Sequence, residues 1–218
     1  MLKLSTLKFL NDLKKNNNRP WFEKNKSRFE NSKTDFTDFV SALLQVLGKT
    51  DPDFLLQDPS KSIFRIYRDV RFSLNKDPYK SHFSASFKTG GRKSHLAGIY
   101  LQIEPGASFM AAGYWQPEPQ LLKLLRQEAE YNGAELRKIL NNKSFLKTWG
   151  KLENLQLKKA PKGFDPDHPD IDLIKYTSYM VSSDLTDDLI LTKDLITHFN
   201  RAYKTVLPFL EFLNRVHH

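Results

Sequence analysis

Residues 99–115 read Ile99-Tyr100-Leu101-Gln102-Ile103-Glu104-Pro105-Gly106-Ala107-Ser108-Phe109-Met110-Ala111-Ala112-Gly113-Tyr114-Trp115. Ile99, Leu101 and Ile103 alternate along the chain, which is the two-residue period of a β-strand with one buried face. Pro105-Gly106 then supplies a tight turn, and a second strand is predicted from Phe109 to Trp115. Because parallel strands need a crossover of about a dozen residues, so short a connection predicts antiparallel pairing.

The same alternation indicates further strands on both sides of this hairpin. Phe83, Ala85 and Phe87 alternate, and Gly90-Gly91 follows them as another tight turn. The other predicted strands are Ile63–Phe72, a brief one at Gln156–Lys158, and Tyr176–Ser182. Together these runs predict one antiparallel sheet of about four to six strands.

Helical periodicity takes over toward both ends of the chain. Ser5 or Thr6 is expected to cap a first helix, and a long second helix is predicted from about Pro20 to Gly48. Its apolar stripe, typical of core packing, comprises Phe22, Phe29, Phe36 and Leu43. Later helices are predicted from Leu121, over Ala134–Leu140 and Ser144–Trp149, and from a Thr192 cap through a kink at Pro208. The predicted fold class is α+β, with helices from both termini packed on the sheet in one domain over residues 1–218.

The composition limits the classes of chemistry and of partner. Thirty-four Lys and Arg against 25 Asp and Glu give a net charge of +9, enough for weak attraction to polyanions. The sequence has no cysteine, which excludes disulfides, thiolate metal sites and cysteine nucleophiles. It shows neither a signal-peptide pattern nor an apolar run long enough to span a bilayer, so we expect a cytoplasmic protein without a membrane partner. His217-His218 is given no functional role.

The densest charge lies on the first predicted strand and the turn after it. Residues 65–80 read Arg65-Ile66-Tyr67-Arg68-Asp69-Val70-Arg71-Phe72-Ser73-Leu74-Asn75-Lys76-Asp77-Pro78-Tyr79-Lys80. On an extended strand Arg65, Tyr67, Asp69 and Arg71 share one face, while Arg68 lies among the apolar residues of the other. Guanidinium groups bind phosphate and carboxylate oxygens in a bidentate manner, so the charged face suits an anion.

Several short motifs, in this order along the chain, resemble those of the DUF2461 family. They are Phe9-Leu10, Asn17–Phe22, Arg65–Ser73, Lys76–Lys80, Gly113-Tyr114-Trp115, Pro161–Phe164 and Asp167-His168-Pro169. The resemblance covers nearly the whole chain, and its central arginine-rich segment is the specific part. It implies a one-domain protein and implies no activity, substrate or cofactor.

Two interpretations of the charged segment follow from its residues. In the first, it forms a pocket for a phosphate- or carboxylate-bearing small molecule, on which Arg65, Arg71 and Lys80 converge. In the second, Asp69 pairs with the arginines and fixes the register of the strand. The pocket is favoured, because a single carboxylate on the strand accompanies three guanidinium groups. The predicted ligand-binding residues are Arg65, Arg68, Asp69, Arg71, Lys76, Tyr79 and Lys80.

Two other groups of residues are weighed as sites. Asp165, Asp167, His168 and Asp170 have hard oxygens and an imidazole, but their spacing matches no known ligand loop, so we predict a turn and no metal. If the protein is an enzyme, His168 and Asp167 are the predicted acid–base pair, because an imidazole titrates near neutrality. Residues 16–22 are interpreted as a capped helix start.

Two functions of other classes compete with a small-molecule site. A nucleic-acid-binding module would use the basic surface, and a structural protein would pair its arginines internally. The sequence names no cofactor, and it leaves open whether a reaction follows binding.

Overall fold

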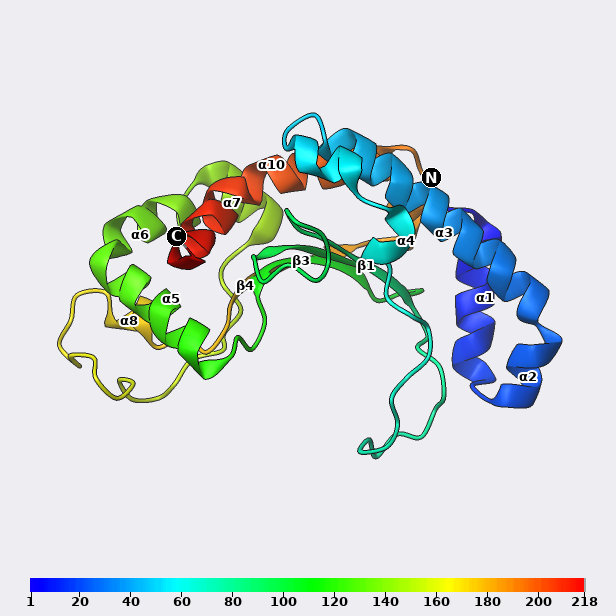
Figure 1. The fold of residues 1–218 in the computed structure, drawn as a ribbon, viewed down its shortest axis with the longest axis horizontal. Helices are drawn as coiled ribbons and strands as arrows, with labels where there is room; N and C mark the ends of the chain where they lie inside the picture. Colours follow the sequence, from blue (N-terminus) through cyan, green and yellow to red (C-terminus); the bar gives the residue numbers. More distant parts are fainter. Residues whose placement is uncertain (218) are drawn as a thin grey trace. The chain divides into compact units, whose positions relative to one another are not determined.

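A four-stranded antiparallel sheet lies at the centre of the fold, which confirms the predicted α+β class. The computed structural model describes residues 1–217, and His218 lies outside the described residues. The sheet order is β1-β2-β3-β4, which is also the chain order, with helices around the sheet (Figure 1). The strands are β1 (Phe83–Phe87), β2 (Gly98–Ile103), β3 (Ser108–Tyr114) and β4 (Tyr179–Leu185).

The connections from β1 to β2 and from β2 to β3 contain the turns that the sequence predicts, whereas helices lie between β3 and β4. Gly90 and Gly91 have φ angles of 77° and 82°, and Gly106 has 72°, in the left-handed region that glycine tolerates best. At the β2–β3 turn the backbone N–H of Ala107 donates to the carbonyl of Glu104.

The chain forms two compact units. The first unit contains residues 1–94, 100–110 and 184–201, and the second contains residues 95–99, 111–183 and 202–218. The single domain over residues 1–218 stays a prediction.

The first unit holds the N-terminal helices and β1. Its helices are α1 (Leu4–Lys15), α2 (Arg19–Lys24), α3 (Lys26–Leu47), η1 (Pro52–Leu56), α4 (Pro59–Ser62), α9 (Asp187–Ile190) and the first part of α10 (Asp194–Asn214). Aromatic side chains fill the space between helices and sheet: Phe29 and Phe36 of α3 stack on Phe83, and Phe199 meets Phe87 edge-on. The apolar stripe predicted from the sequence is therefore core packing.

Two predictions about the N-terminal helices are wrong. The long helix expected from Pro20 to Gly48 is interrupted at Asn25, whose side-chain amide donates to the carbonyl of Trp21 and competes with the helical ladder. Neither Ser5 nor Thr6 caps α1, which begins at Leu4 without a side-chain cap. The Thr6 hydroxyl instead donates to the buried carboxylate of Asp35 and so links α1 to α3.

The predicted strand from Ile63 to Phe72 is also wrong, although the segment is extended. It forms only two isolated antiparallel bridges, Ile63 with Ala85 and Tyr67 with Tyr79. Proline 78 has no N–H to donate, so a continuous ladder cannot form opposite Arg68, whose own N–H donates to the Pro78 carbonyl. Exposure nevertheless alternates as predicted as far as Arg71, with odd-numbered residues from Arg65 exposed.

The second unit holds the remaining helices. They are α5 (Pro119–Tyr131), α6 (Gly133–Leu140), α7 (Lys143–Trp149), α8 (Ile171–Ile174), the second part of α10, which contains Pro208, and η2 (Arg215–His217). The brief strand predicted at Gln156–Lys158 is reduced to one bridge between Gln156 and Tyr176. Within residues 1–217, none of the helices combines the length and apolar character needed to cross a bilayer.

Candidate functional site

The charged segment 65–80 is fixed near both of its ends and exposed between them. Figure 1 shows it running out from α4 and returning to β1 as a long loop. Near its start the Phe64 N–H donates to the Ser84 carbonyl, and near its end the Lys80 N–H donates to the Ile66 carbonyl, at 2.9 and 2.8 Å. Between these anchors the side chains of Phe72 and Leu74 are almost fully exposed, at 96% and 102%.

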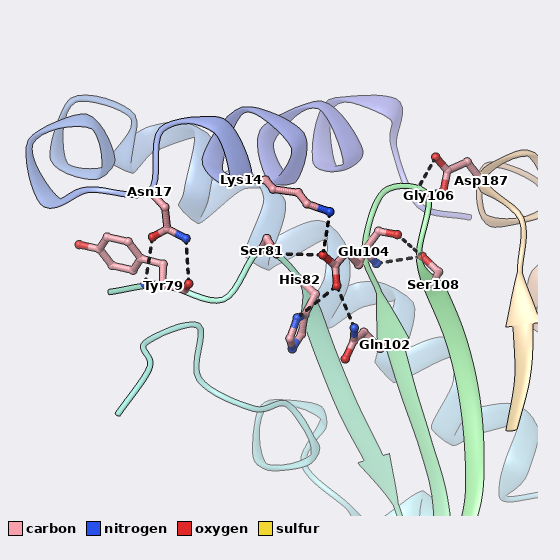
Figure 2. A network of polar contacts seen from close by, with 10 residues as sticks. All are labelled: Lys14, Asn17, Tyr79, Ser81, His82, Gln102, Glu104, Gly106, Ser108 and Asp187. Atoms are coloured by element: carbon pink, nitrogen blue, oxygen red, sulfur yellow. Dashed lines mark hydrogen bonds and ion pairs between the residues drawn. The ribbon is translucent and has the colours of Figure 1, made fainter. Parts of the chain in front are cut away.

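One asparagine side chain fixes the return of this segment. The Asn17 amide nitrogen donates to the Tyr79 carbonyl at 3.0 Å, and its amide oxygen accepts from the Tyr79 N–H at 3.1 Å (Figure 2). The Asn17 side chain thus gives the Tyr79 backbone one donor and one acceptor, as the backbone of a neighbouring β-strand would. Tyr79 is buried and stacks on Phe22 at 4.0 Å, so it supports the core, and burial raises its pKa.

Arg71 and Asp69 pair with each other. The Arg71 Nη2 lies 2.7 Å from the Asp69 Oδ2, and the two side chains are 77% and 47% exposed. The hydrogen bond from Arg71 holds the pKa of the Asp69 carboxyl below its usual range. For Arg71 and Asp69, this ion pair agrees with the interpretation in which Asp69 pairs with an arginine of the charged segment.

Two other cations lie over the ring of Phe64. The Arg92 guanidinium carbon lies 4.8 Å and the Lys80 Nζ 5.5 Å from the ring centroid, and the charge of Arg65 acts on Lys80. Burial lowers the pKa of Lys80, and the positive charges of Arg65 and Arg92 lower it further. We call Arg65, Lys80 and Arg92 the cationic cluster.

The other predicted cations take local partners. Arg68 donates to the Ser73 hydroxyl at 3.3 Å, and Lys76 donates to the Val70 carbonyl at 3.1 Å. Arg71 is engaged by Asp69, and the positive charge of Arg65 lowers the pKa of Lys80. The convergence of Arg65, Arg71 and Lys80 on one pocket stays a prediction. Arg92 follows the predicted Gly90-Gly91 turn, and nothing in the sequence of that turn indicates that it reaches Phe64.

A half-buried carboxylate in the same unit was missed by the sequence analysis. Glu104, directly after β2, accepts hydrogen bonds from Ser81 at 3.0 Å, from Gln102 at 3.0 Å and from Lys14 at 3.3 Å (Figure 2). Its backbone N–H donates to the Ser108 hydroxyl. Three donors from three different segments hold this carboxylate in one position.

The imidazole of His82 lies beside this carboxylate. Its Nδ1 is 3.7 Å from the Glu104 Oε2, and its side chain is 20% exposed. Burial lowers the pKa of His82 to about 4, an effect that Glu104 opposes and that the charges of Lys80 and Arg68 reinforce. In the sequence, His82 and Glu104 are each a titratable residue at the boundary of a predicted strand. Such residues are too common for these two to be identified as a site from the sequence alone.

The turn around His168 forms as predicted. The Asp167 N–H donates to the Asp165 carboxylate at 2.9 Å, and the Asp170 N–H donates to the His168 Nδ1 at 3.1 Å. Asp170 also pairs with Arg137. Nowhere in residues 1–217 do three or more histidine or acidic side chains gather as metal ligands would. The acid–base role of His168 and Asp167 stays a prediction.

Comparison with known proteins gives one match. Residues 5–212 match the family described as "Conserved hypothetical protein (DUF2461)". Since this covers nearly the whole chain, the chain belongs to that family, as the motifs quoted above predicted. Neither the curated proteins nor the solved structures contain a match.

Proposed function

We propose that the protein binds a phosphate- or carboxylate-bearing small molecule at the cationic cluster. The observation that carries this proposal is a group of three like charges, none of which forms an ion pair within the described residues. Among residues 1–217, no carboxylate oxygen lies within ion-pairing distance of Arg65, Lys80 or Arg92. Holding like charges together is unfavourable, and a bound anion would remove that repulsion.

The chemistry of the three cations supports a phosphate or carboxylate over a simple halide. Two guanidinium groups can each donate two parallel hydrogen bonds to such a group, and the ammonium of Lys80 adds a point charge. Lys80 is partly buried, so its interaction with an anion is screened less than that of a fully exposed lysine. From the predicted set, Arg68 contributes positive charge nearby, while Asp69 and Arg71 neutralise each other.

The test is thermal unfolding with phosphate and with citrate, each against sodium chloride at matched ionic strength. At an anion concentration ten times Kd, mass action adds about 1.4 kcal/mol to the free energy of unfolding. For a chain of this size that raises Tm by about 3–6 °C. The double variant Arg65→Gln/Lys80→Met is expected to lose the shift.

Arg71→Gln is the matched control, since it removes an equally charged arginine that already has a carboxylate partner. It is expected to keep both the unliganded Tm and the anion-dependent shift. A wild-type protein whose Tm responds to phosphate and citrate no more than to chloride would show the proposed function to be wrong.

A further inference from the structure

We infer that His82 and Glu104 form an acid–base pair beside the cationic cluster, in which the His82 Nε2 exchanges protons with a phosphate-bearing substrate. This inference rests on the proposed function, because the cluster supplies the substrate's binding energy. Four observations carry it: the orientation of the imidazole, the fixed carboxylate, the second ring nitrogen and the charges that connect the pair to the cluster.

The orientation follows from the carboxylate. Figure 2 shows one nitrogen of the His82 ring turned to Glu104 and the other turned away from it. An anionic oxygen beside Nδ1 favours the tautomer in which Nδ1 carries the proton. The Nε2 then carries the lone pair, which is the arrangement that a general base requires.

Glu104 is suited to be the positioning residue. Its Oε1 accepts from Ser81 and Lys14, and its Oε2 accepts from Gln102, which in turn accepts from the Tyr100 hydroxyl at 2.9 Å. These contacts come from α1, from the segment before β1 and from β2 itself. A carboxylate held in this way keeps its own orientation when the imidazole gains or loses a proton.

The second ring nitrogen is available for chemistry. Among residues 1–217, neither ring nitrogen of His82 has a hydrogen-bond partner: Nδ1 faces Glu104 at 3.7 Å, Nε2 faces no polar group, and the ring is partly exposed. With a pKa of about 4 the imidazole of His82 is neutral at physiological pH but a weak base, and an anion bound at the cationic cluster would raise that pKa and strengthen it as a base.

Charge connects His82 to the cluster. Three charged groups act on the imidazole of His82. They are Glu104, directly after β2, Lys80, two residues before His82 in the chain, and Arg68 on the exposed segment. Lys80 is also a member of the cationic cluster, so an anion bound there would lie close enough to stabilise an imidazolium. When a hydroxyl of such a substrate gives its proton to the Nε2, the O–H bond breaks, its electron pair stays on the oxygen as an alkoxide and an N–H bond forms; the imidazolium then returns the proton to that oxygen.

Histidine side-chain NMR tests this inference without a known substrate, with phosphate as the probe. The His82 signals are assigned from the spectrum of His82→Gln. We expect the Nδ1–H tautomer in the wild type and an increase of about one unit or more in the pKa of His82 when phosphate saturates the cluster. Arg65→Gln/Lys80→Met is expected to abolish that increase.

Glu104→Gln is expected to lower the pKa of His82 further, because the opposing negative charge is lost. Glu30→Gln, which changes an exposed glutamate of α3, is the control and should leave the His82 signals unchanged. If phosphate raises Tm but leaves the tautomer and the pKa of His82 unaffected, the acid–base pair is refuted while the anion site stands. If phosphate does not raise Tm, the site and this inference fail together.

Discussion

At the scale of single residues, position relative to a partner matters more than charge. Arg65 and Arg71 are both exposed arginines on one face of the same segment, and the charges of both act on Asp69, but it is Arg71 that forms the ion pair with it. The sequence could predict that they share a face, because exposure alternates with a period of two. It could not predict which arginine Asp69 would engage, because that depends on where the extended segment bends after Val70.

The neutral imidazole of His82 leads to a prediction about pH. Its pKa in the folded state, about 4, lies below its ordinary value of 6.5, so the unfolded chain binds this proton more tightly. The free energy of unfolding is therefore highest above about pH 6.5, where the imidazole is neutral in both states. It falls as the pH drops from 6.5 toward 4, because the unfolded chain takes up the proton first. Since the ring is one-fifth exposed, we expect a loss of about 2–3 kcal/mol across this window.

The measurement is urea unfolding of the wild type and of His82→Gln between pH 7 and pH 4. Glutamine cannot titrate, so the difference in free energy of unfolding between the two proteins should change by the stated amount across the window. A difference that stays constant with pH would contradict the assignment of a buried neutral imidazole.

At the scale of elements, the close approach of β3 to β4 depends on one glycine. Gly113 has a φ of 111°, and a Cβ built on it would lie 2.1 Å from the Tyr179 carbonyl oxygen. No rotamer change relieves a clash with backbone, so either the strands separate or the Cβ is strained. The motif Gly113-Tyr114-Trp115 was recognised from the sequence as a family feature, and this contact gives its first residue a physical reason.

Gly113→Ala is therefore expected to lower the free energy of unfolding by about 3 kcal/mol, from the strained φ together with the clash. Gly163→Ala is the matched control in the same unit: its φ is 89°, but a Cβ there meets no atom within 4 Å. That variant should lose only about 1 kcal/mol. Equal losses in urea unfolding would show that the contact with Tyr179 is unimportant.

The elements themselves were predictable to different degrees. Strands that pair along their whole length, such as Ile99–Ile103, were predicted correctly. There the alternation of apolar residues and the positions of the tight turns indicate the same strand. The segment Ile63–Phe72 has the same alternation but no ladder, and the helix through Asn25 has an unbroken apolar stripe but a local break. In the first case Pro78 has no N–H for a ladder, and in the second the Asn25 side chain bonds to the Trp21 carbonyl; the period alone reveals neither.

At the scale of the whole molecule, the net charge of +9 raises the question of nucleic acid. The cationic cluster is a local feature of three residues, and the remaining lysines are scattered along the chain. We therefore expect only weak binding of duplex DNA. The logarithm of its binding constant should fall with that of the salt concentration, by about 0.9 per phosphate contacted.

Fluorescence anisotropy of a labelled duplex, from low salt to about 0.15 M, measures this slope. Binding should have disappeared at the upper concentration, in Arg65→Gln/Lys80→Met as in the wild type. Tight binding that persists at physiological salt would favour the nucleic-acid function over the small-molecule one.

The segment between Arg68 and Pro78 offers a place to modify the chain. A β-bridge between Tyr67 and Tyr79 joins its two ends. The Asn17 side chain also forms two hydrogen bonds with the backbone of Tyr79. Its tip, with Phe72 and Leu74 in solvent, contributes nothing to the core. A peptide tag or reporter inserted between Ser73 and Asn75 would lengthen a loop whose ends are already closed, at a cost that grows only slowly with the number of added residues. The tip is therefore an attachment point for following the protein that leaves Arg65, Lys80 and Arg92 unchanged.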